Sequence, residues 1–180
     1  MAIREILTVP HELLKRKARK VTDFGPGLQT LIDDMLETMR DAPGSGLAAT
    51  QVGVMERVFI AEFGDEDDEE VPPKLYIIVN PVIARKSKEI VSGIEGCLSV
   101  PEYVGEVERA EAITLKGHNR HGQKMKLKAN GWLARIFQHE IDHLDGVVFL
   151  DRAEKIYRLE DIQAAQAEKM EEGGNPLEIG

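Results

Sequence analysis

The segment His139-Glu140-Ile141-Asp142-His143 constrains this chain more than any other feature, because it places two imidazoles and a carboxylate within five residues. Apolar residues at helical spacing surround it and predict a helix from about Asn130 to His143. Residues four apart on a helix share one face, so both histidines can bind one metal ion. Glu140 stands beside them, placed to take a proton from a water molecule. The pattern therefore predicts a metal-dependent hydrolase site on one helix.

The third metal ligand is left open by these residues, because two histidines alone do not hold a catalytic metal. The longer pattern H-E-x-x-H-x-x-G-x-x-H is matched through Gly146 but ends on Phe149, so the third histidine of a metzincin is missing. A zincin-type protease could use a downstream acid instead. The other candidate is Cys97, the single cysteine of the chain. The downstream acids on the expected last helix are Glu160, Asp161 and Glu168.

The order of the expected elements is typical of an α+β fold. An apolar stripe at helical spacing predicts a helix over residues 27–41, and Pro43-Gly44 ends it. Residues rich in β-branched and aromatic side chains, or alternating between polar and apolar, predict the strands. These strand segments are 57–61, 75–79, 89–92, 104–108, 112–116 and 124–128. A C-terminal helix is expected over residues 153–172, followed by a tail over residues 173–180.

Length and pattern together predict a single domain over residues 1–180. We expect an N-terminal helix, antiparallel or mixed β-sheets packed around the helix that carries the H-E-x-x-H segment, and the C-terminal helix. Six consecutive acids begin at Asp65, and Pro72-Pro73 follows them. Like charges at this density stay solvated, so residues 65–73 are expected to form an exposed acidic loop.

Charge and cysteine usage exclude several classes of protein. The chain has 180 residues and a net charge of −9, which disfavours a protein that binds free nucleic acid. One cysteine excludes an intrachain disulfide framework and favours a reducing compartment. The first residues lack the apolar core of a secretory signal, and no run approaches 18 apolar residues, so no membrane contact is expected. A cytoplasmic protein is the expectation.

A third segment of interest is the run of small residues from Gly44 to Gly53. Small residues let a ligand approach the backbone closely. Gln51 within this run offers a side-chain N–H that could stabilise a developing oxyanion.

Together these segments resemble the peptide deformylase family. Residues 44–51, 95–99 and 138–143 match its three motifs in order and at similar separations. The flanking residues match as well, so the resemblance covers roughly residues 1–152. The joint occurrence of the three motifs is specific, whereas each motif alone is not.

The resemblance implies an enzyme that removes the N-formyl group from the N-terminal formyl-methionine of new polypeptides and releases formate. It implies that Cys97, His139 and His143 hold one divalent metal ion per chain, Fe²⁺ in the cell, with Zn²⁺, Ni²⁺ or Co²⁺ as substitutes. Glu140 would be the proton-transferring base, and the Gln51 side chain and the Leu98 backbone N–H would bind the oxyanion.

The same resemblance assigns the substrate-binding residues. The backbone near Ser45, Gly46 and Gly96 would align the peptide as an added strand. The methionine side chain would lie in a pocket lined by Trp132 and Ile136, with Glu95 nearby. Ser45 departs from the family, which usually has a branched apolar residue there. A further hypothesis pairs Glu95 with Arg109, which matches an arginine of the family.

The expected partner is a formyl-methionyl nascent peptide. Some members of the family dock on the ribosome through a basic C-terminal helix. Residues 152–180 of this chain carry 4 Lys and Arg against 7 Asp and Glu, a net charge of −3. RNA phosphate would repel that charge, so the sequence argues against this ribosome contact.

Two other functions stay open beside the deformylase. One is the zincin-type protease with a downstream acidic ligand. The other is a non-catalytic protein, which either binds formylated N-termini or holds a structural metal with a fourth ligand such as His118 or His121. Glu140 and Gln51 argue against the non-catalytic functions, because binding alone needs neither.

Overall fold

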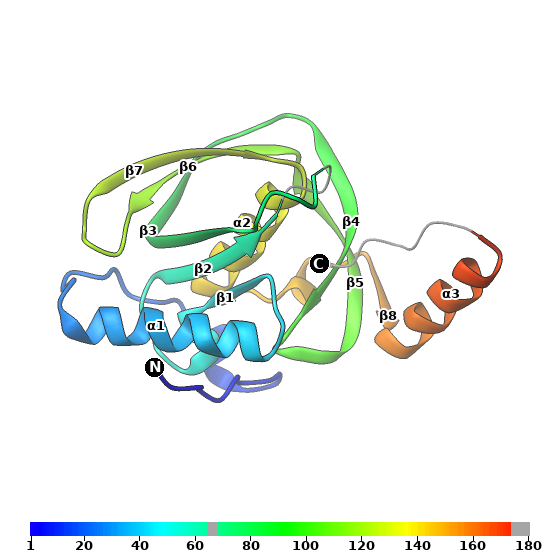
Figure 1. The fold of residues 1–180 in the computed structure, drawn as a ribbon, viewed down its shortest axis with the longest axis horizontal. Helices are drawn as coiled ribbons and strands as arrows, with labels where there is room; N and C mark the ends of the chain where they lie inside the picture. The colour runs from blue at the N-terminus through cyan, green and yellow to red at the C-terminus, as the bar shows by residue number, and fades with distance from the viewer. Residues whose placement is uncertain (65–67, 174–180) are drawn as a thin grey trace.

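The strands form two antiparallel sheets, and helix α2 lies between them and contacts strands of both (Figure 1). The computed structural model describes residues 1–64 and 68–173. One sheet has the strand order β1-β2-β3-β6-β7 and the other the order β4-β5-β8. The strands are β1 Gly46–Ala48, β2 Val58–Phe63, β3 Lys74–Lys86, β4 Ile90–Cys97, β5 Val100–Ala110, β6 Ala112–His118, β7 Lys124–Asn130 and β8 Lys155–Arg158. The α-helices are α1 Pro26–Asp41, α2 Gly131–Leu144 and α3 Leu159–Glu171, and short 3₁₀ turns cover Glu12–Lys15, Ala49–Val52 and Phe149–Asp151.

Helix α1 confirms the helix expected from the apolar stripe. Pro26 opens it, where the fixed φ of proline suits the first turn. Ile32, Met35 and Met39 are completely buried and pack with residues of β1 and β2. Burying a side chain of this size stabilises a fold by about 1.5–3 kcal/mol, so this face alone fixes α1 on the five-stranded sheet.

Helix α2 confirms the second expected helix and forms the centre of the fold. Every residue from Ala134 to Leu144 is buried. Phe137 packs against Phe59, with ring centroids 5.6 Å apart, and against Tyr76 at 5.2 Å. A helix that is buried on all sides is unusual unless its polar residues have partners or a function. Its buried histidines and glutamate are therefore candidates for a functional site.

The six expected strand segments all fall on strands of the structure. The structure adds the pairing that the sequence did not show. Strand β4 turns back into β5 directly after Cys97, and the pairing is irregular between Glu95 and Cys97. Strand β1 is an edge strand of its sheet, and β4 is an edge strand of the other. The small-residue run and the cysteine segment therefore each lie at the edge of a different sheet.

The expected C-terminal helix is wrong at its beginning. Residues 155–158 form strand β8, which pairs with β5, and α3 starts only at Leu159. Ile156 on β8 is 52% exposed, whereas Ile162 on α3 is buried. Pairing with the open edge of β5 supplies backbone hydrogen bonds that a local helical pattern cannot anticipate.

Two expectations fall partly outside the described residues. The acidic loop over residues 65–73 includes 65–67, which are not described; residues 68–73 are exposed, as expected. The tail over residues 173–180 is described only at Gly173. None of the helices in the described part of the chain combines the length and apolar content needed to cross a bilayer.

Candidate metal centre and active site

His139 and His143 lie one turn apart on the same face of α2. Their ring centroids are 5.0 Å apart, and both side chains are buried. The i, i+4 spacing puts the two rings side by side, as the helical prediction required.

Cys97 approaches these histidines from the end of β4. Its Sγ lies 3.2 Å from Nε2 of His143, and the ligand atoms of Cys97, His139 and His143 all lie within 4.8 Å of one another. The backbone N–H of Ser99 and the side-chain amide of Gln51 point at the same sulfur, at 3.4 Å and 3.5 Å. Cysteine binds metals through its sulfur, so these two donors lie directly beside the atom that a metal ion would use.

This donor set fits a divalent transition metal. One thiolate and two imidazoles suit zinc, iron, nickel and cobalt, and not calcium or magnesium. The cluster has three members within the described residues. Neither the downstream acids Glu160, Asp161 and Glu168 nor His118 and His121 belong to it. Three protein ligands with an open position are typical of catalytic metal sites, whereas structural sites are closed by four.

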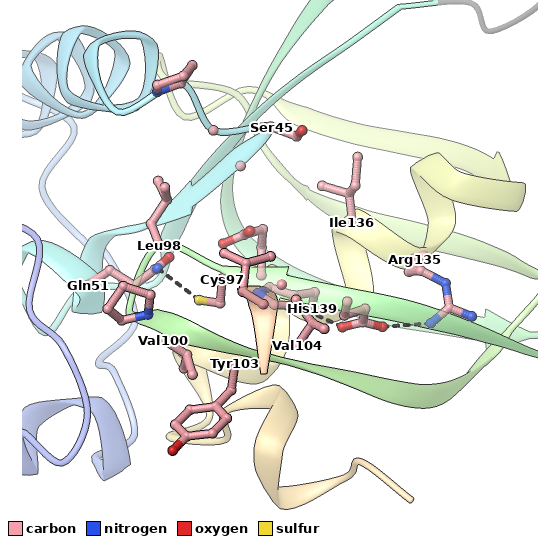
Figure 2. A pocket seen from close by; sticks show the side chains of 18 of the residues that line it. Ser45, Gln51, Cys97, Leu98, Val100, Tyr103, Val104, Arg135, Ile136 and His139 are labelled. Carbon is pink, nitrogen blue, oxygen red and sulfur yellow. Dashed lines mark hydrogen bonds and ion pairs between the residues drawn. The ribbon is translucent and has the colours of Figure 1, made fainter. Parts of the chain in front are cut away.

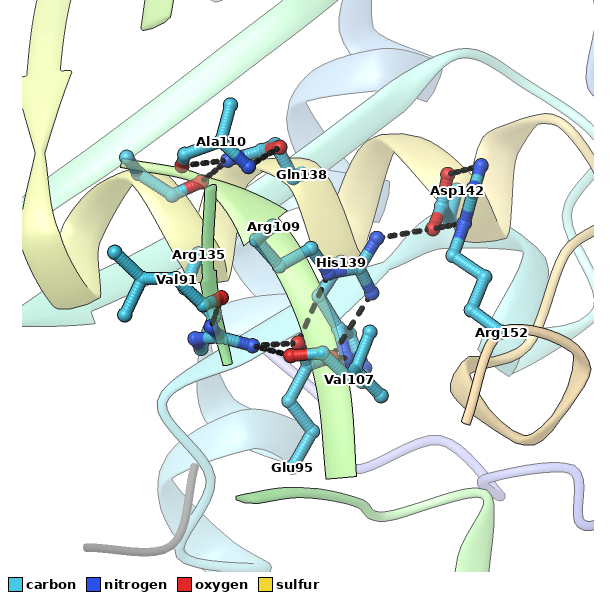
Figure 3. A network of polar contacts seen from close by, with 11 residues as sticks. Val91, Glu95, Val107, Arg109, Ala110, Arg135, Gln138, His139, Asp142 and Arg152 are labelled. Atoms are coloured by element: carbon cyan, nitrogen blue, oxygen red, sulfur yellow. Dashed lines mark hydrogen bonds and ion pairs between the residues drawn. The ribbon is translucent and has the colours of Figure 1, made fainter. Parts of the chain in front are cut away.

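The Nδ1 side of the His139 ring forms a hydrogen bond with Glu95 (Figure 3). Its Nδ1 lies 2.8 Å from Oε1 of Glu95, which is 2% exposed. This contact leaves Nε2 of His139 to face the other ligands, so it fixes how the ring is presented.

The carboxylate of Glu95 is itself saturated with partners. Arg109 donates to both oxygens at 2.9 Å, and Arg135 donates to Oε2 at 2.7 Å. Burial alone would raise the pKa of Glu95, but the hydrogen bonds and charges of Arg109 and His139 outweigh it and hold the pKa well below its ordinary value. The expected pair of Glu95 with Arg109 is thus present in the structure, and it belongs to a larger network.

Asp142 extends this network along α2. Arg109 donates to its Oδ2, and Arg152 donates to both of its oxygens at 2.6 Å and 3.0 Å. The carboxylates of Glu95 and Asp142 therefore share one buried guanidinium. Asp142, Arg152 and Arg135 are not among the candidate residues that the sequence predicts.

Glu140 lies on the cavity side of α2 and is 4% exposed. Its Oε2 has no hydrogen-bond partner among the described residues. Burial raises its pKa to about 7, with a smaller contribution from the charge of Glu95, while His139 and Arg109 act in the opposite direction. A carboxylate whose pKa lies near neutrality can both accept and return a proton.

Gly46 explains how Glu140 fits beneath β1. A Cβ at this position would lie only 2.5 Å from Oε1 of Glu140. Only glycine therefore lets β1 pass this close to the carboxylate.

Gln51 and Leu98 lie beside the sulfur of Cys97 and line the same cavity (Figure 2). The Oε1 of Gln51 accepts a hydrogen bond from the Ala48 N–H at 2.9 Å, which orients the amide so that Nε2 faces Ser99 Oγ at 3.0 Å and the sulfur. Gln51 thus presents N–H groups next to the three-ligand cluster. Leu98 lies between Cys97 and Ser99, at the turn from β4 to β5.

The cavity in front of the cluster has a volume of about 470 Å³. All the residues expected to bind substrate line it, namely Ser45, Gly46, Glu95, Gly96, Trp132 and Ile136. Glu95 is a special case, because both of its carboxylate oxygens are taken up by His139, Arg109 and Arg135. Its carboxylate therefore acts on His139, not on the cavity contents.

Several residues that line the cavity are not predicted from the sequence. Tyr103 and Val104 are residues of β5, and Leu159 is the first residue of α3. No local signal could identify them, because their place depends on the pairing of β5 with β8. Arg135 did carry a signal, since it precedes His139 by one helical turn and so shares its face.

Comparisons with a family model, with related sequences and with solved structures all point to one family. Residues 3–159 match the polypeptide deformylase family. A peptide deformylase of Natranaerobius thermophilus is 44% identical over 161 residues, which cover 89% of this chain and 99% of the relative. The crystal structure of peptide deformylase from Thermotoga maritima has a TM-score of 0.80 and 35% identity, covering 86% of this chain and 100% of that one. A Met-Ala-Ser-bound class I type b peptide deformylase from Acinetobacter baumannii has a TM-score of 0.77 and 35% identity, covering 84% and 98%.

Proposed function

This chain belongs to the polypeptide deformylase family, and on that premise we propose that it hydrolyses the N-formyl group of formyl-methionyl polypeptides and releases formate. The observation that carries the proposal is the cluster of Cys97, His139 and His143 beside Glu140 at the base of one cavity. The Oε2 of Glu140, which has no hydrogen-bond partner among residues 1–64 and 68–173, supports it further, because a buried polar atom without a partner is characteristic of functional sites.

We propose one divalent metal ion per chain, held by Cys97, His139 and His143. The metal in the cell is Fe²⁺ in this proposal, and Zn²⁺, Ni²⁺ or Co²⁺ can replace it, because all four suit a site of one sulfur and two nitrogens. When bound, such an ion acidifies water and polarises a carbonyl oxygen.

Glu140 moves the proton in the proposed reaction. Its Oε2 takes a proton from the attacking water, and the carboxyl then returns it to the nitrogen of the departing peptide amine. The charge that develops on the formyl oxygen is stabilised by the Nε2 hydrogens of Gln51 and by the backbone N–H of Leu98. The raised pKa of Glu140, about 7, suits a group that accepts a proton and then gives it back.

The peptide is proposed to lie between the edges of the two sheets. Ser45 and Gly46 of the β1 segment and Gly96 of β4 line the cavity from opposite sheets, so their backbone groups can pair with an extended chain. Trp132 and Ile136 from α2 would contact the methionine side chain. The Acinetobacter baumannii relative binds Met-Ala-Ser, a tripeptide that begins with methionine, which supports a peptide as the occupant of this cavity.

The proposed partner is a nascent peptide in the cytoplasm, where formylated chains are synthesised and a thiolate stays reduced. Ribosomal RNA is not proposed as a partner of α3. This helix carries four acids, Glu160, Asp161, Glu168 and Glu171, against one lysine, Lys169.

The test is formate release from formyl-Met-Ala-Ser by protein purified without oxygen and loaded with Fe²⁺. We expect formate and free Met-Ala-Ser in equal amounts. Cys97→Ser should abolish both stoichiometric metal binding and turnover. A zincin-type protease would keep its metal in this variant and would cleave the bond between methionine and alanine, and a formyl-peptide-binding protein would retain the peptide uncut. Either result would contradict the proposal.

A further inference from the structure

Arg135 is a buried cation that the proposed reaction does not use. It lies one turn before His139 on α2 and is 5% exposed. Its Nη1 donates to Oε2 of Glu95 at 2.7 Å and to the carbonyl of Val107 at 2.9 Å, and its Nη2 donates to the carbonyl of Val91 at 2.7 Å (Figure 3). One guanidinium thus joins α2 to β4, to β5 and to the carboxylate that holds His139.

Gly93 shows that the guanidinium is closely fitted against β4. A Cβ at Gly93 would lie 2.9 Å from Cζ of Arg135 and 3.0 Å from its Nε. Gly93 pairs with Val107 across the two strands, so the guanidinium lies over the point where β4 and β5 meet. Any side chain at this position would force the guanidinium of Arg135 to shift.

The same guanidinium lies over the indole ring of Trp132. Cζ of Arg135 lies 5.5 Å from the indole centroid, within the range of a cation–π interaction. Trp132 and Arg135 both line the cavity. The side chain that steadies Glu95 therefore also supports a wall of the cavity.

We propose that Arg135 is a positioning residue that couples this wall of the cavity to the metal ligand His139. It acts on His139 through Glu95, and on the substrate pocket through Trp132. The planar guanidinium can bond Glu95 and two carbonyls and pack against Gly93 and the indole at once, which a lysine ammonium cannot do. The inference rests on the proposed function, because it assigns a role within the same site.

Removing the guanidinium gives the first test. Arg135→Met and Arg135→Lys are loaded with Co²⁺, and the rate of Co²⁺ release to a chelator is followed together with the visible spectrum of the bound ion. We expect release to quicken ~10–100-fold and the spectrum to change in both variants, because His139 loses the support that fixes its ring. Arg57→Met is the matched control: Arg57 bonds the Leu144 carbonyl and Asp145 at the far end of α2 and has no contact with Glu95.

Displacing the guanidinium without removing it gives the second test and does not depend on whether the first variants fold. Gly93→Ala leaves Arg135 in the chain but takes its space. We expect the same spectral change and a smaller increase in Co²⁺ release. In the Arg135→Met background, Gly93→Ala should add little, because the atoms it would strike are gone. Gly27→Ala is the control, since a Cβ at Gly27 meets no atom within 4 Å.

Trp132 provides a readout independent of the metal, because it is the only tryptophan in the chain. We expect its fluorescence and its quenching by acrylamide to change in the Arg135 variants and in Gly93→Ala, and to stay unchanged in both controls. With a peptide substrate, KM for formyl-methionyl peptide should rise as kcat falls.

The outcomes separate the two claims. A folded Arg135→Met that matches the wild type in Co²⁺ release, spectrum and Trp132 fluorescence would overturn the positioning role, as would a lower melting temperature with all three unchanged. Wild-type protein that binds no Co²⁺ would overturn the proposed function, and Trp132 would still report whether Arg135 supports the cavity wall.

Discussion

Two buried glutamates, Glu95 and Glu140, lie next to His139, and their carboxylates differ in how many hydrogen-bond partners they have. Glu95 is 2% exposed, and its oxygens accept hydrogen bonds from His139, Arg109 and Arg135. Glu140 is 4% exposed, and its Oε2 has no partner in the described part of the chain. The pKa of Glu95 is lowered because its cationic partners outweigh burial, whereas burial raises the pKa of Glu140 to about 7.

This difference indicates that Glu95 has a supporting role and that Glu140 takes part in the reaction. A carboxylate whose lone pairs are all occupied is fixed in position and stays charged, so it can orient a neighbouring imidazole. A buried carboxylate without partners is destabilised in its charged form, so it binds a proton readily. Environments that shift the pKa values of two carboxylates in opposite directions give the two groups different roles.

Replacing Glu95 should have the largest effect on stability. In metal-free protein, Glu95→Gln leaves Arg109 and Arg135 without their shared anion, so we expect a loss of about 3–5 kcal/mol in the free energy of unfolding. Urea denaturation at pH 7 measures it. Glu62→Gln, which breaks only the surface pair with Arg40, should lose at most about 1 kcal/mol. Equal losses in the two variants would show that the Glu95 network is no stronger than a surface pair.

Arg109→Met should have the next largest effect. Arg109 is shared by Glu95 and Asp142, but each carboxylate keeps another arginine, so we expect a loss on the order of 3 kcal/mol. The melting temperature of metal-free protein should fall by roughly 6–12 °C. The amount of metal bound at limiting Co²⁺ should fall with it, because Glu95 loses its bidentate partner. Unchanged stability and metal binding would break the link between this network and His139.

Glu140→Gln should act in the opposite direction and stabilise metal-free protein. The pKa of Glu140 is raised in the folded state, so the wild type loses stability as pH rises from about 4.5 to about 7, while Gln pays no such ionisation penalty. Below pH 4.5 the two proteins should be alike, and above pH 7 the variant should be more stable by about 1–3 kcal/mol. Urea denaturation at pH 4 and pH 8 tests the sign. A variant less stable at pH 8 would mean that Glu140 has a stabilising partner.

Gly46→Ala should have the smallest effect on stability and sharpens the comparison further. The new Cβ would force Glu140 away from β1, at an expected loss of about 1–2 kcal/mol. Turnover should fall by more than this strain alone would suggest, because Glu140, the proposed base, is displaced from the reacting atoms. Thermal unfolding and formate release on the same preparation give both numbers. Full turnover would show that the position of Glu140 is not critical.

The sequence predicts those features of the site that depend on local geometry. Histidines four residues apart must share a helix face, so their meeting at one point follows from the helical period. Cys97 is 42 residues before His139, and the residues alone left it in competition with downstream acids; only the family resemblance favoured it. In the structure the turn from β4 into β5 brings Cys97 next to the two histidines, and no helical or strand period encodes that turn.

What the sequence does not show depends on pairing between distant segments. Asp142 occupies an ordinary position of the H-E-x-x-H motif. Its partner Arg109 comes from β5, and its partner Arg152 directly follows the 3₁₀ turn after α2. The local pattern predicts a helix where β8 lies, because the β5 segment that pairs with β8 is about fifty residues earlier in the chain. Single-sequence periodicity contains no information about such partners.

The most direct test of the account is to measure formate release and bound metal together in Glu140→Gln. Both the variant and the wild type are loaded with Co²⁺, and formyl-Met-Ala-Ser is the substrate. We expect one metal ion per chain in both proteins and a fall in kcat of ~10²–10⁴-fold in the variant, because only the proton transfer is lost. A variant that holds its metal and releases formate at the wild-type rate would contradict the proton-transfer role of Glu140. It would also contradict the division of roles in which Glu95 orients His139 and Glu140 takes part in the reaction.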